Sequence, residues 1–139
     1  MTIMPPSSLQ QKSPPVVFVL EDEPLIRDAL ACALSDAGCC VREGQNANAA
    51  IRAFEKGEHI DVVVTDVNMP GRKDGVALAA WMKDHAPGVP IVLISGYPLR
   101  SDLAAVNPAI AIVVKKPYTP EEVVGWVASL ANLEISRAA

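Results

Sequence analysis

Short, continuous runs of apolar residues recur along the chain, and each is followed by a segment with a helical spacing of apolar residues. The runs are VVFVL at 16–20, IDVVVTD at 60–66, PIVLIS at 90–95 and AIVVK at 111–115, and CCVRE at 39–43 is expected to be a further short strand. Apolar runs of this length are typical of strands that are buried on both faces. Their alternation with amphipathic helices predicts an α/β fold with a parallel sheet covered by helices on both sides.

The segments between these runs carry start and stop signals of helices. Pro24 stands at the start of the first expected helix, which runs through the apolar positions from Leu25 to Leu34 and ends at Gly38. Further helices are expected at about 46–57, 74–85, 99–106 and 119–130. The segment 99–106 has the sparsest apolar stripe of the set.

Length and charge limit the classes of protein that this chain can belong to. Its 139 residues fit one domain, expected at 16–133, after a flexible Pro-rich tail at 1–15 and before a C-terminal tail at 134–139. The formal net charge is −4 and there is no basic run, which disfavours direct nucleic-acid binding. The sequence has neither a secretory signal nor an apolar stretch of transmembrane length, so no membrane association and a cytoplasmic location are expected.

The three cysteines show no metal-ligand spacing. They are Cys32, Cys39 and Cys40. We expect all three to be small core residues in a reducing compartment.

Polar side chains stand just past four of the expected strands. Glu21 and Asp22 follow the first strand, Asp66 the third, Ser95 the fourth, and Lys115 and Lys116 the fifth. In open parallel sheets the carboxyl ends of the strands share one edge, and ligands bind there. The polar residues at these strand ends are therefore expected to form a single site.

The composition of this site indicates phosphoryl chemistry. Three converging carboxylates repel one another, and Mg²⁺ is a hard cation that relieves such repulsion with oxygen ligands. A lysine and a hydroxyl beside them suit a phosphoryl group, whose transfer depends on in-line positioning and charge neutralisation. An aspartate can itself be the nucleophile, and Asp66 ends an expected central strand.

The segments VVFVLEDE, VVVTDVNMPG, VPIVLISGY and VVKKPY, in this order, resemble the receiver domain of two-component response regulators. The resemblance covers about 16–133. It implies a flavodoxin-like (βα)5 doubly wound fold, with a five-stranded parallel sheet of order 2-1-3-4-5. It also implies that Asp66 accepts a phosphoryl group, with Mg²⁺, from the phosphohistidine of a sensor histidine kinase or a histidine phosphotransfer protein. Such a domain catalyses only its own phosphorylation and dephosphorylation, so it is not expected to be an enzyme.

The resemblance assigns roles residue by residue. Glu21 and Asp22 match the acidic pair that holds Mg²⁺, Asp22 directly and Glu21 partly through water. Asn68 matches the position whose backbone carbonyl is a further metal ligand. Ser95 matches the hydroxyl that bonds a phosphoryl oxygen on activation, and Lys116 matches the lysine that pairs with the phosphoryl group.

One position departs from the family pattern. An aromatic residue usually stands three residues before the lysine, where it swings inward on activation, but here that position is Val113. Tyr97 is a candidate replacement, expected either to lie over Asp66 and slow attack by water or to form part of a docking surface. Lys115, next to Lys116, is expected to point to the other face of the sheet.

Two classes of function stay open at this point. The first is a stand-alone receiver that switches protein contacts or relays phosphate, with an unknown downstream protein and a possible homodimer through the fourth helix, last strand and last helix. The alternative is a Mg²⁺-dependent aspartyl phosphatase of haloacid-dehalogenase-like kind, although such enzymes usually carry an acid where Asn68 stands. Dinucleotide binding is disfavoured because Glu21, Asp22 and Glu23 occupy the place of a glycine-rich turn.

Overall fold

The computed structural model of the chain describes residues 13–68, 74–97 and 103–131. Most of the expected tail at 1–15 and all of the expected tail at 134–139 lie outside these residues. The first part of the helix expected at 99–106 also lies outside them.

Within the described residues the core of the fold is a five-stranded parallel sheet of order β2-β1-β3-β4-β5. The strands are β1 (Val16–Leu20), β2 (Cys40–Gly44), β3 (Val62–Asp66), β4 (Ile91–Ser95) and β5 (Ile110–Lys115). Strands β3 and β4 are buried along their whole length, as their apolar runs predicted. The strand order confirms the expected fold and places β3 in the centre of the sheet.

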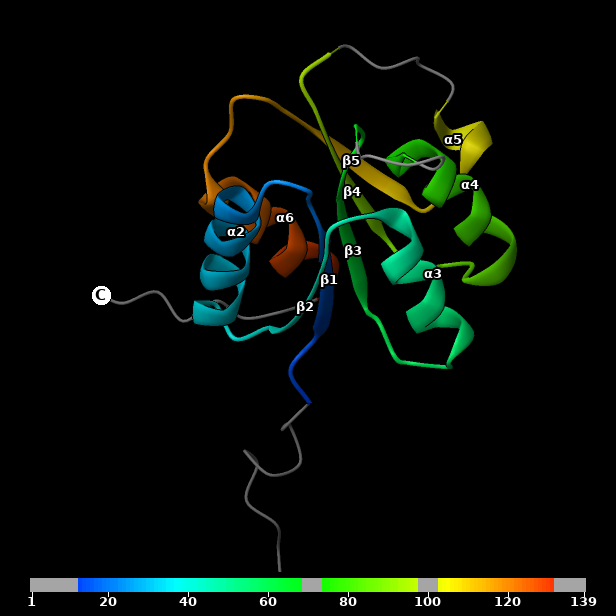
Figure 1. Cartoon of the computed structure of the whole chain (residues 1–139), viewed down its shortest axis with the longest axis horizontal. Helices are drawn as coiled ribbons and strands as arrows, with labels where there is room; N and C mark the ends of the chain where they lie inside the picture. The colour runs from blue at the N-terminus through cyan, green and yellow to red at the C-terminus, as the bar shows by residue number, and fades with distance from the viewer. Residues whose placement is uncertain (1–12, 69–73, 98–102, 132–139) are drawn as a thin grey trace, which may run out of the picture.

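Helices cover both faces of the sheet in the described residues (Figure 1). They are α2 (Pro24–Asp36), α3 (Ala47–Glu55), α4 (Gly75–His85), α5 (Leu103–Val106) and α6 (Pro120–Ala131). Helices α2 and α6 lie on one face, and α3, α4 and α5 lie on the other. Each face has its own apolar cluster, the first around Phe18, Leu78 and Leu93 and the second around Val19, Leu34 and Val127.

Side-chain caps set the starts of two helices that follow strand ends. The Asn46 side chain accepts a hydrogen bond from the backbone N–H of Ala49 at 3.1 Å, which confirms its predicted role as a cap. The Asp74 side chain caps α4 in the same way, accepting from the N–H of Ala77 at 2.8 Å. These caps fix where the chain leaves the C-terminal edge of the sheet.

Two expectations about burial are wrong. Cys39 is buried, but Cys32 in α2 and Cys40 in β2 are exposed, so the cysteines are not a set of core residues. Leu25 belongs to the apolar pattern of α2, yet 84% of its surface is exposed. It stands in the first turn of α2.

Candidate functional site: an acidic cluster beside Asp66 and Lys116

Asp66 is the last residue of the central strand β3 and is buried, with 3% of its surface exposed. Both of its carboxylate oxygens are engaged. Oδ1 accepts a hydrogen bond from the backbone N–H of Asn68 at 3.0 Å. Oδ2 accepts from Lys116 Nζ at 2.6 Å. A buried carboxylate held by a lysine and a backbone donor is fixed in orientation and partly neutralised.

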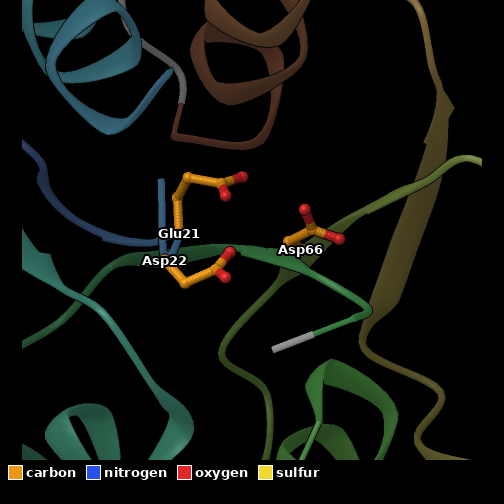
Figure 2. Close-up of side chains that lie close together, drawn as sticks. All are labelled: Glu21, Asp22 and Asp66. Carbon is orange, nitrogen blue, oxygen red and sulfur yellow. The ribbon is translucent and has the colours of Figure 1, made fainter. Parts of the chain in front are cut away.

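Two further carboxylates come from the end of β1. Carboxylate oxygens of Glu21, Asp22 and Asp66 all lie within 4.8 Å of one another. Figure 2 shows the Glu21 and Asp22 side chains leaving adjacent positions of the chain on opposite sides, with Asp66 facing both from the neighbouring strand. Glu21 is buried and Asp22 is exposed. The structure therefore brings together the three acids that the sequence predicted.

The local backbone explains the position of Glu21. Its N–H donates to the carbonyl of Gly44 at 3.1 Å, which extends the pairing of β1 with β2 by one residue. Its carbonyl accepts from Arg27 Nη1 at 2.8 Å. In the side chain, Oε1 accepts from the N–H of Glu23 at 3.1 Å, whereas Oε2 is buried and has no hydrogen-bond partner in the described part of the chain.

The electrostatics of the cluster follow from burial and like charge. Burial first, together with the neighbouring acids Asp22 and Asp66, raises the pKa of Glu21 to about 7, against the lowering effect of the Glu23 N–H. Burial by itself lowers the pKa of Lys116, but the hydrogen bond to Asp66 and the nearby acidic charges outweigh it, so the pKa is raised overall. The lysine is thus a fixed positive charge at neutral pH.

Lys116 reaches the site from the end of β5. Its backbone N–H donates to the Ser95 carbonyl at 2.9 Å, and its peptide bond to Pro117 is cis. Lys115 is paired with Ser95 across the β4–β5 ladder, and its side chain is exposed. Lys116, rather than Lys115, makes the ion pair with Asp66.

Ser95 and the switch candidates adopt a defined arrangement. The Ser95 hydroxyl donates to the Tyr97 carbonyl at 2.8 Å and accepts from the Tyr97 N–H at 3.1 Å. Tyr97 itself is 68% exposed, an exposure that favours a surface role over a cover for Asp66. Val113 is partly buried against the apolar cluster of Phe18, Leu78 and Leu93 and pairs with Leu93 on β4.

The donor set fits a divalent cation such as Mg²⁺. Three carboxylates converge with a single lysine hydrogen-bonded to them among the described residues, so the cluster retains excess negative charge. The free Oε2 of Glu21 supplies an additional oxygen donor with no other use. Hard oxygen donors of this kind are the ligands that Mg²⁺ prefers.

Sequence reasoning missed two residues of this region. Tyr118 lies directly after Lys116 and Pro117, and its hydroxyl is buried without a hydrogen-bond partner in the described residues. Gly75 begins α4 against the backbone of Asp66, where an added Cβ would lie 2.5 Å from the Asp66 carbonyl oxygen. For Tyr118 the sequence signal was a tyrosine directly after the Lys-Pro pair, whereas nothing in the sequence marks Gly75.

Comparison with known proteins identifies the class. The chain matches the family model of the response regulator receiver domain over residues 17–128, and it therefore belongs to this family of signalling phosphoacceptors. The family match supports the receiver interpretation, and no finding supports the haloacid-dehalogenase-like alternative. No helix in the described part of the chain is long and apolar enough to span a membrane.

Particular relatives share both sequence and fold with this chain. The DNA-binding transcriptional regulator NtrC of Salmonella typhimurium is 29% identical over 113 residues, which are 81% of this chain and 24% of that protein. The nitrogen assimilation regulatory protein NtrX of Azorhizobium caulinodans is 27% identical over 110 residues, 78% of this chain and 24% of that protein. The chain thus spans about a quarter of the length of these two curated relatives.

Two solved structures resemble the chain along nearly its whole described length. A response regulator receiver protein from Sinorhizobium medicae has a TM-score of 0.76 and 28% identity, covering 86% of this chain and 95% of that one. The response regulator protein TrrA from Thermotoga maritima was solved in complex with Mg²⁺-BeF. It has a TM-score of 0.72 and 29% identity, and the match covers 84% of this chain and 98% of that one. The TrrA structure is thus one of a response regulator protein that holds Mg²⁺ together with BeF.

Proposed function

We propose that this chain is a phosphorylation-dependent switch in which Asp66 accepts a phosphoryl group from the phosphohistidine of a sensor histidine kinase or a histidine phosphotransfer protein. The observation that carries the proposal is the 2.6 Å bond between Asp66 Oδ2 and Lys116 Nζ inside a cluster of three carboxylates. A buried aspartate at the centre of the sheet, held by a lysine, has the position and the neighbours that an acyl-phosphate nucleophile needs.

The transfer uses groups that the site already holds. A carboxylate oxygen of Asp66 forms the new O–P bond while the P–N bond of the phosphohistidine breaks, and the electron pair returns to the imidazole nitrogen. Lys116 then stabilises the negative charge on the phosphoryl oxygens. Ser95, in a buried position at the end of β4, is the candidate hydroxyl donor to one of these oxygens. The new acyl phosphate adds charge at the C-terminal edge of the sheet.

We assign the metal to Glu21, Asp22 and Asp66, with the backbone carbonyl of Asn68 as a further candidate ligand. When bound, Mg²⁺ supplies neutralisation of the carboxylates and of the phosphoryl oxygens. The lack of a partner for Glu21 Oε2 in the described residues supports this assignment.

An apolar groove supports a protein as the phosphodonor. A cavity of about 600 Å³ opens beside Lys116 between the start of α2 and the loop that leads to α6. Its apolar lining includes Leu25, Ile26, Ala29 and Pro117. An exposed leucine at the rim of an apolar groove is typical of a surface that a partner covers. We propose that a helix of the phosphodonor docks there and presents its phosphohistidine to Asp66.

We further propose that residues 16–133 act as one receiver unit whose output is a changed protein contact or onward phosphate transfer. The surface of α5, β5 and α6 is the candidate for that contact, including contact with a second copy of the chain. The exposed Trp126 on α6 supports a partner on this surface, because large apolar side chains in contact with water are enriched at interfaces.

The acceptor assignment is tested by labelling with acetyl phosphate in the presence of Mg²⁺. Asp66→Asn is expected to abolish labelling, because the amide cannot form the acyl phosphate. Asp84→Asn is the matched control, since Asp84 is an exposed residue of α4 with the same chemistry. Equal labelling of the Asp66→Asn variant and the wild type would exclude Asp66 as the acceptor, and sustained turnover of small phosphoesters would favour the phosphatase alternative.

A further inference from the structure

Arg27, in the first turn of α2, joins this helix to the acidic segment Glu21–Glu23 at the end of β1. Its guanidinium Nη1 donates a hydrogen bond to the carbonyl of Glu21 at 2.8 Å, and its Nε lies 3.6 Å from Glu43 Oε1 at the end of β2. Its backbone N–H donates to the carbonyl of Glu23 at 2.9 Å. Arg27 therefore contacts both ends of the acidic segment, and the rigid fork of donors in its guanidinium reaches β2 as well.

The carbonyl that accepts the guanidinium bond belongs to the peptide group between Glu21 and Asp22. This group is planar, so it can change its orientation only by turning as a unit. Such a turn changes the backbone angles on both sides of it and re-aims both carboxylates, which leave the chain on opposite sides (Figure 2). A bond that fixes this carbonyl thus fixes the two acids relative to each other.

The backbone N–H of Glu21 is held from the opposite side, by β2. It donates to the carbonyl of Gly44 at 3.1 Å. Gly44 is itself closely packed, because an added Cβ would lie 2.7 Å from Ala49 Cβ and 3.0 Å from Leu20 Cδ2. Both backbone polar groups of Glu21 are therefore bonded, one to the end of β2 and the other to Arg27.

We propose that Arg27 is a positioning residue of the Mg²⁺ site, whose hydrogen bond to the Glu21 carbonyl holds Glu21 and Asp22 in the orientation that binds the cation. This inference rests on the proposed function, which assigns the metal to these acids. Groups that orient metal ligands typically change metal affinity by about 10–100-fold when removed. Arg27 acts through the main chain of the two acids and is not itself a ligand of the metal.

Mg²⁺ binding to the purified full chain, measured by titration calorimetry, tests this role. Arg27→Gln removes the bond to Glu21 and is expected to raise the Kd for Mg²⁺ by about tenfold. Arg52→Gln is the matched control, because Arg52 on α3 is exposed and lines the same surface cavity as Arg27. This control removes a positive charge from the same neighbourhood and leaves the bond to Glu21 intact. Its Kd is expected to equal that of the wild type or to be lower, since the lost charge opposes a cation.

The sign of the change separates positioning from charge. If Arg27 acted through its charge alone, Arg27→Gln would bind Mg²⁺ more tightly than the wild type, because a nearby positive charge repels a cation. An Mg²⁺ affinity of Arg27→Gln equal to or higher than that of the wild type would therefore overturn the role of Arg27 alone. Failure of the wild type to bind Mg²⁺ would instead overturn the proposed function on which this role rests.

Hydrogen exchange of single amides in chelator-treated protein, measured by NMR, reads the same bond without metal. The Glu23 N–H donates to Glu21 Oε1 at 3.1 Å, so its exchange is expected to quicken several-fold in Arg27→Gln as Glu21 loses its fixed orientation. The Ala49 N–H, bonded to the Asn46 side chain at 3.1 Å beside the same cavity, is expected to keep its rate. Unchanged exchange at Glu23, or the same acceleration at both amides, would contradict a positioning role for Arg27.

Discussion

Glu21 carries much of the electrostatic cost of the site. It is 2% exposed, yet one of its carboxylate oxygens has no hydrogen-bond partner in the described residues. Burial, together with the other two acids of the cluster, raises its pKa to about 7. A carboxylate in such a place is unfavourable for the metal-free fold, and a bound cation relieves the cost. The arrangement thus favours binding of a cation but lowers the stability of the folded protein when no cation is bound.

This arrangement predicts a pH dependence with a definite sign. The ordinary pKa of a glutamate side chain is 4.5, and that of Glu21 in the fold is about 7, so the folded protein binds more protons than the unfolded chain between these values. The contribution of Glu21 to stability is therefore full below about pH 4.5 and is lost as the pH rises through about 7, by up to about 3 kcal/mol. Urea unfolding of chelator-treated protein between about pH 5 and pH 8 measures this loss.

Glu21→Gln isolates the effect, because the amide cannot ionise. The variant is expected to lack this part of the pH dependence and to be more stable than the wild type above about pH 7. Glu55→Gln, at an exposed site in α3, is expected to keep the wild-type profile. Parallel pH profiles for the wild type and Glu21→Gln would show that Glu21 does not titrate in this range.

At the residue scale, the sequence predicted the members of the site better than their contacts. Glu21, Asp22, Asp66 and Lys116 were predicted because each stands at a strand end, and strand ends of a parallel sheet converge. The orphaned hydroxyl of Tyr118 was not predicted, since it depends on how neighbouring side chains share their donors and acceptors. Burial of single positions, as at Cys32, also depends on how the helix is rotated against the sheet.

Helix α4 begins directly against the backbone of Asp66. Its first residue, Gly75, donates its N–H to the carbonyl of Val67 at 2.9 Å. A Cβ at this position would lie 2.5 Å from the Asp66 carbonyl oxygen and 3.1 Å from Val67 Cα. These neighbours are backbone atoms, so they cannot move aside as a flexible side chain does. The start of α4 thereby supports the backbone that presents Asp66.

Gly75→Ala is therefore expected to displace α4 or the Asp66 backbone, with a loss of about 1–3 kcal/mol in stability and slower labelling by acetyl phosphate. Gly125→Ala is the matched control, because a Cβ at Gly125 in α6 meets nothing within 4 Å. That variant is expected to gain about 0.5–1 kcal/mol from the higher helix propensity of alanine and to keep the wild-type labelling rate. Chemical unfolding and labelling kinetics of the two variants give the comparison. A tolerated Gly75→Ala would show that α4 is not fixed against Asp66.

The elements themselves follow closely from the sequence pattern. The predicted strands at 16–20 and 90–95 differ from β1 and β4 by at most one residue, because buried runs are bounded sharply by polar residues and proline. The predicted strand at 60–66 begins two residues early, since Ile60 is buried without being part of the ladder. The segment with the sparsest apolar stripe forms the four-residue helix α5, none of whose residues is buried.

For the whole molecule, periodicity predicted a parallel sheet covered on two faces, but the strand order came from the resemblance to receivers. Periodicity alone does not say which strands are neighbours. The observed order places β3, which ends in Asp66, beside β1, and it places β4 between β3 and the edge strand β5. Ser95 ends β4, and its hydroxyl contacts the start of the loop that follows, at the Tyr97 backbone.

That loop is held by Ser95 in the structure described. The hydroxyl makes two bonds to the Tyr97 backbone, at 2.8 Å and 3.1 Å, and it has to leave them to bond a phosphoryl oxygen. With Mg²⁺ and beryllofluoride bound, the Tyr97 amide is therefore expected to exchange hydrogen faster, and protection is expected to change in α5 and β5. Helix α3, which packs against β1 and β2, is expected to keep its local exchange pattern.

Ser95→Ala provides the control for this hydrogen-exchange experiment. The variant lacks both bonds to Tyr97, so its Tyr97 amide is expected to exchange fast before any ligand is added. Adding beryllofluoride is then expected to change the exchange rate of this amide little, although Asp66 and the metal ligands remain in place. If the wild type shows no change at 96–97 or 103–115 when the mimic binds, the switch does not pass through Ser95. Because Val113 replaces the usual aromatic, the signal from Asp66 would then have to leave the site by α4, whose first residue lies directly against the Asp66 backbone.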